Sequence, residues 1–267
     1  MGADIKTLRV RIKSVDSTLH LTKAMGLVAS SKIRGATAAM LRSRDYSTAL
    51  TAIVDQLSSC AECRKSPFVA GNESDKTKII VIAGDRGLAG GYNANVFREA
   101  AKYPDAEFIP IGKRACERFS QDYVSSEKYP VSEAYALAKR LCEQFKNGEF
   151  GRLGIISTRY VSMMTQEAFT QWVLPLEKKE RESGAGTVFE PDEGYILDTA
   201  VPEYVTGLIF GSVLESYACE VVARRTAMDS AGKNAQQMID DLRLQYNRAR
   251  QGAITQEITE IIAGSGA

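Results

Sequence analysis

The sequence is poor in the residues from which most active sites are built. It contains a single histidine, His20, among 267 residues. The metalloprotease pattern HExxH, the hydrolase pattern GxSxG and a pair of catalytic carboxylates are also missing. His20 lies on a helical segment with no nucleophile in view, so we interpret it as a solvated helix residue. The sequence therefore predicts a protein without a catalytic site of its own.

Cysteine is scarce and scattered. The five cysteines are odd in number, which argues against a disulfide framework and fits a reducing compartment. Cys60 and Cys63 form a CxxC pair. A zinc site would need a second ligand pair, and a redox site would need a thioredoxin-like strand and helix around it. Neither is present, so we predict free thiols, no metal site and no assigned role for the pair.

Excess charge and long apolar runs are missing too. The net charge of +1 gives no global reason to expect nucleic acid as a partner. No run approaches the roughly 20 apolar residues of a membrane span, so we expect no direct insertion into a membrane. The first residues lead straight into a helical pattern without signal or transit features. We therefore expect the protein to work in the cytoplasm.

What the sequence has instead is a long amphipathic pattern at each end. From Ile5 to Leu57 one apolar stripe repeats in steps of three and four, and no proline occurs before Pro67. Such a heptad register over about 55 residues predicts a helix that winds around a partner helix. The stripe consists of Ile5, Leu8, Ile12, Val15, Leu19, Thr22, Gly26, Ala29, Ile33, Ala36, Met40, Ser43, Ser47, Leu50, Val54 and Leu57.

The C-terminal segment supplies the partner. Pro202 and Glu203, preceded by Asp198 and Thr199 as candidate caps, predict where this second helix begins, and we expect it to match the first in length. The stripe then drifts toward Ile254, Ile258 and Ile261. Its heptad positions are Leu214, Tyr217, Val221, Arg224, Met228, Ala231, Ala235, Met238, Leu242, Gln245 and Ala249.

Small residues occupy the middle of both stripes. Gly26, Ala29 and Ala36 face Ala223 to Ala235 in the expected pairing. Small side chains give up burial energy but let two backbones approach closely, which predicts a thin antiparallel coil. Alanine is also the best helix former, so an ordinary alanine-rich bundle remains an alternative.

Basic residues outnumber acidic ones on the N-terminal helix. The excess is compatible with a solvated face or with a face that meets an acidic partner. Nucleic acid is a weaker alternative, because no aromatic residues are interleaved with the charge. The basic residues are Lys6, Arg9, Arg11, Lys13, Lys23, Lys32, Arg34, Arg42 and Arg44.

Strands and helices alternate between the two terminal patterns. This order predicts an inserted, doubly wound, mostly parallel α/β domain. The predicted domains are residues 1–63, the N-terminal coiled-coil helix; 64–202, the α/β domain with its linkers; and 203–267, the C-terminal coiled-coil helix. The expected strands are 78–83, 107–112, 153–160 and 169–176, with helices from about 93 to 102, from 113 and from 132 to 146.

One loop resembles a ligand site by its position. Residues 84–91 (GDRGLAGG) lie between a predicted strand and helix, where phosphates commonly bind. The loop has neither the Gly-Lys-Ser/Thr ending of a P-loop nor the GxGxxG spacing of a dinucleotide site. We interpret it as a structural turn and predict no bound cofactor.

Three motifs stand out along the chain. They are residues 21–25 (LTKAM) with 28–32 (VASSK), residues 85–95 (DRGLAGGYNAN) and residues 247–261 (NRARQGAITQEITEI). In this order they are similar to the N-terminal signature, the central loop and the C-terminal signature of one family, the gamma subunits of F-type rotary ATP synthases. The resemblance covers nearly the whole chain.

The resemblance implies a non-catalytic rotor. The helix pair would be the central shaft inside an α3β3 head, and the α/β domain would meet the epsilon subunit and the membrane c-ring. Rotation would couple H⁺ or Na⁺ flow to ATP synthesis on the β subunits, at the cytoplasmic face of a bacterial cell membrane. By motif, Lys23, Met25, Arg250, Gln251 and Thr255 would contact β. A weaker match assigns Glu190, Pro191 and Tyr204 to epsilon or the ring.

Two other functions remain as alternatives. The chain could be a coiled-coil scaffold whose α/β domain spaces two partners, which predicts a stable isolated dimer. It could also be a nucleotide-binding enzyme with a helical arm, which predicts binding heat with Mg-ATP.

Overall fold

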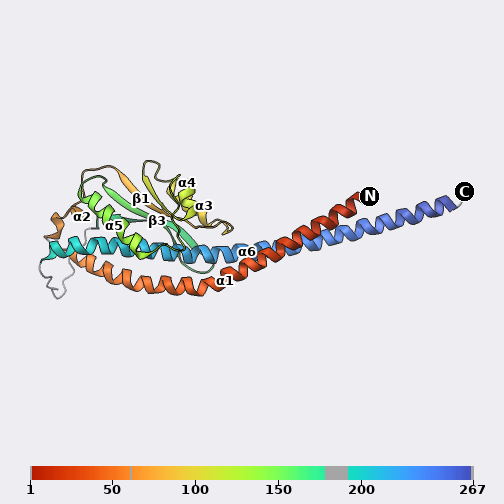
Figure 1. Ribbon diagram of the computed structural model, residues 1–267, viewed down its shortest axis with the longest axis horizontal. Coiled ribbons are helices and arrows are strands. Elements are labelled where there is room, and N and C mark those ends of the chain that lie inside the picture. The colour runs from red at the N-terminus through yellow and green to blue at the C-terminus, as the bar shows by residue number, and fades with distance from the viewer. Residues whose placement is uncertain (1, 61, 178–191, 266–267) are drawn as a thin grey trace. The chain divides into compact units, whose positions relative to one another are not determined.

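The computed structural model describes residues 2–60, 62–177 and 192–265 (Figure 1). Its contacts form two compact units, one of Met1–Ser30 with Arg224–Ala267 and one of Ser31–Ala223. In chain order the elements are α1 (Gly2–Ser58), the 3-10 helix η1 (Cys63–Lys65), α2 (Pro67–Ala70), β1 (Thr77–Ile82), α3 (Tyr92–Ala100), β2 (Glu107–Ile111), α4 (Lys113–Arg118), α5 (Val131–Lys146), β3 (Arg152–Tyr160), β4 (Gln166–Leu174) and α6 (Glu193–Ser265).

The first unit is an antiparallel pair of helix segments. As residue numbers increase along α1, the numbers of the residues that they contact on α6 decrease. Arg9 contacts Tyr246, Leu19 contacts Ile239, and Gly26 contacts Arg225. Every position of the predicted α1 stripe from Ile5 to Leu57 is buried or half-buried. The predicted antiparallel pairing and its register on α1 are therefore confirmed.

The predicted register on α6 is wrong in one stretch. Met238 is 45% exposed, whereas the next residue, Ile239, is 1% exposed. Gln245 is likewise exposed, and Tyr246 takes its place in the seam. The seam steps by four residues from Ala235 to Ile239, because an α-helix with 3.6 residues per turn drifts from a strict heptad.

The predicted start of α6 is also wrong. The helix begins at Glu193, with Pro202 inside it, and has 73 residues against 57 in α1, so the two do not match in length. Its cap is Asp192, whose Oδ1 accepts a hydrogen bond from the N–H of Tyr195 at 2.8 Å. Thr199 instead donates to the carbonyl of Tyr195 within the helix. Burial of the core-facing side of this turn offsets the donor lost at proline.

The second unit contains a four-stranded sheet in the order β2-β1-β3-β4. β1 pairs in parallel with β2 and with β3, and β4 pairs antiparallel with β3. A short turn joins β3 to β4, with the N–H of Ser162 donating to the carbonyl of Thr165. A turn this short permits only an antiparallel pair, because a parallel pair needs a long crossover. The predicted mostly parallel sheet is confirmed.

Both faces of the sheet are covered. Ile80 and Ile82 of β1 point into a core shared with α5, α1 and α6, whereas Ile79 and Val81 point into a smaller core with α3 and α4. Strands buried on both sides read as continuous apolar runs, as β1 does. Within this unit the terminal helices therefore form one layer of the domain.

One segment of α6 is apolar enough to suit a membrane. A window of 18 residues in it has a mean hydropathy of 1.4, and 67% of the window is buried inside the structure. Val201, Val205 and Ile209 of α6 are fully buried in the larger core. Packing in this core accounts for the hydropathy.

The two compact units divide the chain differently from the predicted domains. The predicted domains keep each terminal helix whole, whereas the contacts place residues 31–58 and 193–223 with the sheet. The domain boundaries at residues 63 and 202 stay predictions about how the sequence is organised.

Replacing Phe68 by alanine tests the shared core. Phe68 is fully buried in α2 and stacks on Phe145 of α5 with ring centroids 6.1 Å apart. We expect Phe68→Ala to lower the free energy of unfolding by about 3–5 kcal/mol because it leaves a cavity. The fluorescence of the single tryptophan, Trp172 of β4, reports the urea transition of this unit. Tyr123→Ala, at a side chain 62% exposed, is the control and should change the free energy of unfolding by less than about 0.5 kcal/mol.

Candidate functional site

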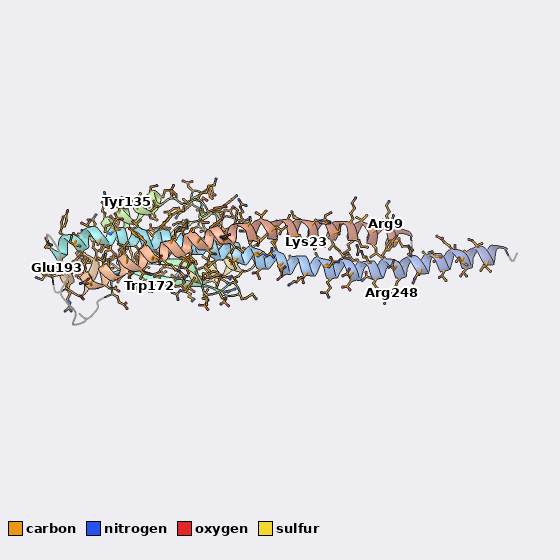
Figure 2. All side chains as sticks on the ribbon, turned by 90° about the horizontal axis from the view of Figure 1, so that it is seen from below. Arg9, Lys23, Tyr135, Trp172, Glu193 and Arg248 are labelled. Carbon is orange, nitrogen blue, oxygen red and sulfur yellow. The ribbon has the colours of Figure 1, made fainter. Side chains whose placement is uncertain are left out.

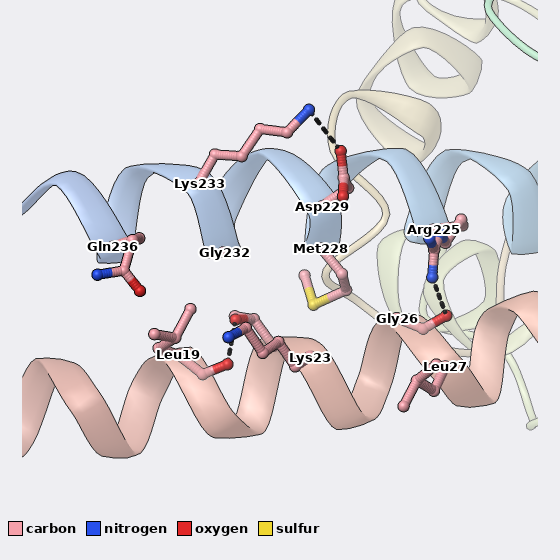
Figure 3. A pocket seen from close by; sticks show the side chains of 11 residues that line it. Leu19, Lys23, Gly26, Leu27, Arg225, Met228, Asp229, Gly232, Lys233 and Gln236 are labelled. Atoms are coloured by element: carbon pink, nitrogen blue, oxygen red, sulfur yellow. Dashed lines mark hydrogen bonds and ion pairs between the residues drawn. The ribbon is translucent and has the colours of Figure 1, made fainter.

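A groove follows the seam of the helix pair in the first unit. Its volume is about 450 Å³, and Gly26 of α1 and Gly232 of α6 lie in its walls (Figure 3). A Cβ on Gly26 would approach the Cβ of Met228 to 3.5 Å, which is ordinary contact distance. Arg225 closes one end by donating to the carbonyl of Gly26 at 3.2 Å. Small residues of both helices therefore line the groove, and the position of Gly26 has room for a methyl group.

The N-terminal signature residues lie on α1 beside this groove. Lys23 lines the groove, and its side chain is exposed. Arg9 of α1 and Arg248 of α6 are also exposed (Figure 2). Met25 is half-buried. Lys23 therefore presents a cation at the surface, whereas Met25 exposes only part of an apolar side chain.

The C-terminal signature residues lie on the exposed end of α6. Arg250, Gln251 and Thr255 are all exposed, and the Thr255 hydroxyl donates to the carbonyl of Gln251 at 2.9 Å. Ile258 is 52% and Ile261 70% exposed on the same part of the helix. The predicted apolar face exists, but among the described residues nothing covers it.

The residues assigned to epsilon or the ring lie elsewhere. Tyr204 of α6 is half-buried and packs against the larger core of the second unit. Its pKa is raised, first by burial and then by the charges of Asp55 and Glu177. Glu190 and Pro191 lie outside the described residues.

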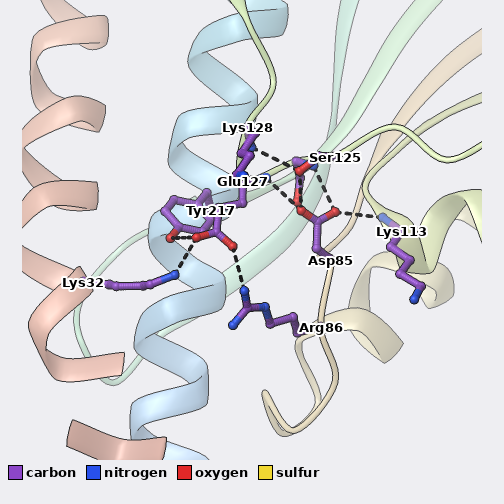
Figure 4. Close-up of polar contacts among 9 residues, drawn as sticks. Lys32, Asp85, Arg86, Lys113, Ser125, Glu127, Lys128 and Tyr217 are labelled. Carbon is purple, nitrogen blue, oxygen red and sulfur yellow. Dashed lines mark hydrogen bonds and ion pairs between the residues drawn. The ribbon is translucent and has the colours of Figure 1, made fainter. Parts of the chain in front are cut away.

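The glycine-rich loop is held by Asp85, which follows β1 (Figure 4). Its carboxylate accepts from the N–H groups of Lys113, Ser126 and Glu127 at 2.9–3.0 Å and from the Ser125 hydroxyl at 2.7 Å. Burial raises the pKa of Asp85, but these hydrogen bonds outweigh it and hold the pKa below its usual value. Asp85 therefore joins the end of β1 to the loop before α5.

The chain's own side chains fill the space at this loop where a phosphate would lie. The side-chain amide oxygen (Oδ1) of Asn93 accepts from the N–H of Gly84 at 2.9 Å. The carboxyl group of Glu220, on α6, would be 2.6 Å from a Cβ added to Gly84. A buried carboxylate at this point repels an anion. These contacts support the interpretation of the loop as a structural turn.

Glu127 is a further polar residue near this loop that the sequence does not single out. Its carboxylate meets Lys32 of α1 at 2.5 Å, the Tyr217 hydroxyl of α6 at 3.2 Å and Arg86 at 3.5 Å (Figure 4). The bond to Lys32 lowers the pKa of Glu127, and this effect outweighs its burial. Lys32 and Arg86 lie in two of the sequence motifs and Tyr217 lies on the predicted α6 stripe, but Glu127 belongs to none of these patterns. Only the folded chain shows that the four residues meet.

His20 and Cys63 each lie in surroundings that do not favour a reactive side chain. The His20 side chain is 75% exposed and lies 3.6 Å from Asp16. The thiol of Cys63 is buried, and burial raises its pKa to about 11, which disfavours the reactive thiolate. Among the described residues, no three His, Cys, Asp or Glu side chains are grouped as metal ligands.

Comparison with known proteins gives the family. The family model described as ATP synthase matches residues 4–267. The ATP synthase gamma chain of Ruminococcus albus is 38% identical, over 98% of each chain. The sodium ion specific ATP synthase gamma chain of Acetobacterium woodii is 36% identical, over 100% of this chain and 99% of that relative. This chain belongs to the family of ATP synthase gamma chains.

Solved structures agree on the fold of the gamma chain. A rotor chain of the mitochondrial ATP synthase of Euglena gracilis matches with a TM-score of 0.68 at 18% identity, over 95% of this chain and all of that one. A central stalk chain of the Tetrahymena thermophila enzyme matches with a TM-score of 0.60 at 18% identity, over 79% of this chain and 99% of that one. This gamma chain is thus a non-catalytic, peripheral subunit of a membrane complex.

Substituting Asp85 tests the loop anchor of the gamma chain. We expect Asp85→Asn to lower the free energy of unfolding at neutral pH by about 1 kcal/mol, since the half-exposed carboxylate is partly screened by water. The pKa of Asp85 is lowered by folding, so its contribution is fully present above the unfolded value of about 3.9 and disappears as the pH falls through the lower folded value.

Urea denaturation as a function of pH measures this difference. The wild-type and variant curves should separate at neutral pH and converge in acid. Asp122→Asn, at an exposed carboxylate of the same region, is the matched control. A separation that does not depend on pH would contradict the assigned role of the Asp85 charge.

Proposed function

We propose that this gamma chain is the central rotor shaft of a rotary F-type ATP synthase, which couples ion-driven rotation to conformational change on the β subunits. The observation that carries the proposal is the antiparallel pair of α1 and α6, with an uncovered apolar end on α6. Among the described residues, side chains fill the loop where a nucleotide would bind. The proposed function therefore rests on surfaces that meet other subunits.

The shaft acts by contacting three β sites differently. A pair of unlike helices has no threefold symmetry, so each orientation presents different side chains to each β subunit. Differential contacts shift each site toward a different conformation, which is a population shift. ATP and Mg²⁺ would bind on the α3β3 head, and this chain would hold no cofactor.

The two signature regions provide the contacts to β. Lys23 is an exposed cation that suits an acidic segment of β, and Met25 adds a partly exposed apolar surface. Arg250 and Gln251 are exposed donors on α6, and Thr255 lies one turn further. The planar guanidinium of arginine gives directional bonds to carboxylates.

The α/β domain would meet the epsilon subunit and the c-ring. Glu190, Pro191 and Tyr204 are proposed for this contact. Tyr204 supports it only in part, because its ring already packs on the chain's own core. The related rotor structures include a central stalk with its c-ring. The curated relatives are bacterial, so we place the chain at the cytoplasmic face of a bacterial cell membrane.

A double substitution tests the proposed contact to β. We expect Arg250→Ala with Gln251→Ala to lower rotation-coupled ATP turnover by about tenfold or less while the complex still assembles, since charge-assisted bonds are lost on the surface. Lys139→Ala, which removes an exposed charge from α5, is the control and should leave turnover unchanged. Normal turnover in the double variant would remove these residues from coupling.

The apolar end of α6 gives a second test. Because Ile261 is 70% exposed, Ile261→Ser should change the stability of the isolated chain by less than about 0.5 kcal/mol. If the head encloses this end, the same change should weaken the recovery of α and β with a tagged gamma chain. Full recovery would show that Ile261 is not buried on assembly.

A further inference from the structure

Glu127 brings three separate segments of the second unit to one carboxylate. One oxygen of Glu127 accepts hydrogen bonds from the ammonium group of Lys32 of α1 at 2.5 Å and from the Tyr217 hydroxyl of α6 at 3.2 Å. The other oxygen lies 3.5 Å from the guanidinium group of Arg86. The Glu127 side chain is 23% exposed and that of Lys32 37% exposed. Both long helices therefore contact the same side chain of the α/β domain, as Figure 4 shows.

The position of Glu127 is set from the end of β1. Its N–H donates to one oxygen of Asp85 at 3.0 Å, and the Ser125 hydroxyl donates to the same oxygen at 2.7 Å. The other oxygen of Asp85 accepts from the N–H of Lys113 at the start of α4. Glu127 is thus fixed to the sheet and not carried on a free loop.

A second carboxylate, on α6, makes a similar set of contacts. Glu215, on α6, accepts from Arg44 of α1 at 2.6 Å and from the N–H of Tyr160 in β3 at 2.8 Å. Its side chain is 20% exposed. Each of the two carboxylates therefore links α1, α6 and the sheet domain: Glu127 from the sheet domain, and Glu215 from α6.

These contacts lie far from the covalent links between the helices and the sheet. The chain leaves α1 after Ser58 and enters α6 at Glu193. Lys32 lies about 40 Å along α1 from Ser58, at 1.5 Å per residue. Twist applied to the sheet domain reaches this stretch of the helices through side-chain contacts, and ion pairs with directional bonds resist sliding better than apolar contacts do.

Building on the proposed rotor function, we infer that Glu127 and Glu215 form a torque clamp that holds the shaft helices to the α/β domain, with Asp85 as a positioning residue. The clamp binds no ligand and takes no part in chemistry. It limits how far α1 and α6 twist against the sheet while load acts on that domain.

The test measures twist in the assembled complex. The α3β3 head is immobilised, and a bead is attached to Met164→Cys, a hairpin residue 84% exposed, in a Cys60→Ser background because the other four cysteines are buried. We expect Glu127→Gln and Glu215→Gln each to increase the angular variance of the bead at a catalytic pause about twofold, the scale for losing one partly exposed ion pair. Glu117→Gln, which breaks an ion pair within α4, should leave the variance unchanged.

Two further variants separate the clamp from general loosening. Lys32→Met combined with Glu127→Gln should increase the variance no more than Glu127→Gln alone, because both remove the same bond. Tyr217→Phe deletes one hydroxyl and keeps the ring, so it gives a smaller increase even if the charge variants do not assemble. Wild-type variance in Tyr217→Phe and in the carboxylate variants that assemble would overturn the clamp. A wild-type complex that turns over ATP without rotating the bead would overturn the proposed function and the clamp with it.

Discussion

The pairing of α1 with α6 brings residues from the two ends of the chain together, and each helix depends on the other. The stripe on α1 is mostly apolar, apart from Thr22, Ser43 and Ser47, and an isolated helix would leave its apolar side chains in water. The same dependence explains the end of α6, where the isoleucines from Ile254 to Ile262 are exposed in the isolated chain. A protein that encloses this end would complete the burial that α1 provides elsewhere.

The helix pair is also part of the α/β domain. Val54 and Leu57 of α1 share one core with Val205 and Ile209 of α6 and with the inner face of the sheet. The doubly wound sheet therefore uses the two terminal helices, with α5, as the layer on one face and α3 and α4 on the other. A force on the sheet domain reaches the helices through this core and through the carboxylates of Glu127 and Glu215.

Features that depend on the pattern of apolar residues can be predicted from the sequence, whereas contacts between polar residues far apart in the chain cannot. The α1 stripe and the strands follow from the spacing of apolar residues, which reports burial directly. The mostly parallel sheet follows from the alternation of strands and helices along the chain. The start of α6 is predicted too late in the chain because the helix-breaking signal of Pro202 is local. The burial of Leu197 and Val201, which lie before it, depends on the whole fold. Glu127 meets Lys32 across 95 positions of sequence, and pairs of polar residues so far apart leave no pattern to read. The shift from Met238 to Ile239 follows from helix geometry that a strict heptad ignores.

In the proposed function, α1 and α6 turn inside the α3β3 head. A reversible disulfide between Gln251→Cys and a cysteine placed on the facing surface of β, in a chain with Cys60→Ser, tests it most directly. If the shaft rotates, ATP turnover by the assembled complex should stop when the bond forms and return when it is reduced. Undiminished turnover with the bond fully formed would contradict a rotating shaft.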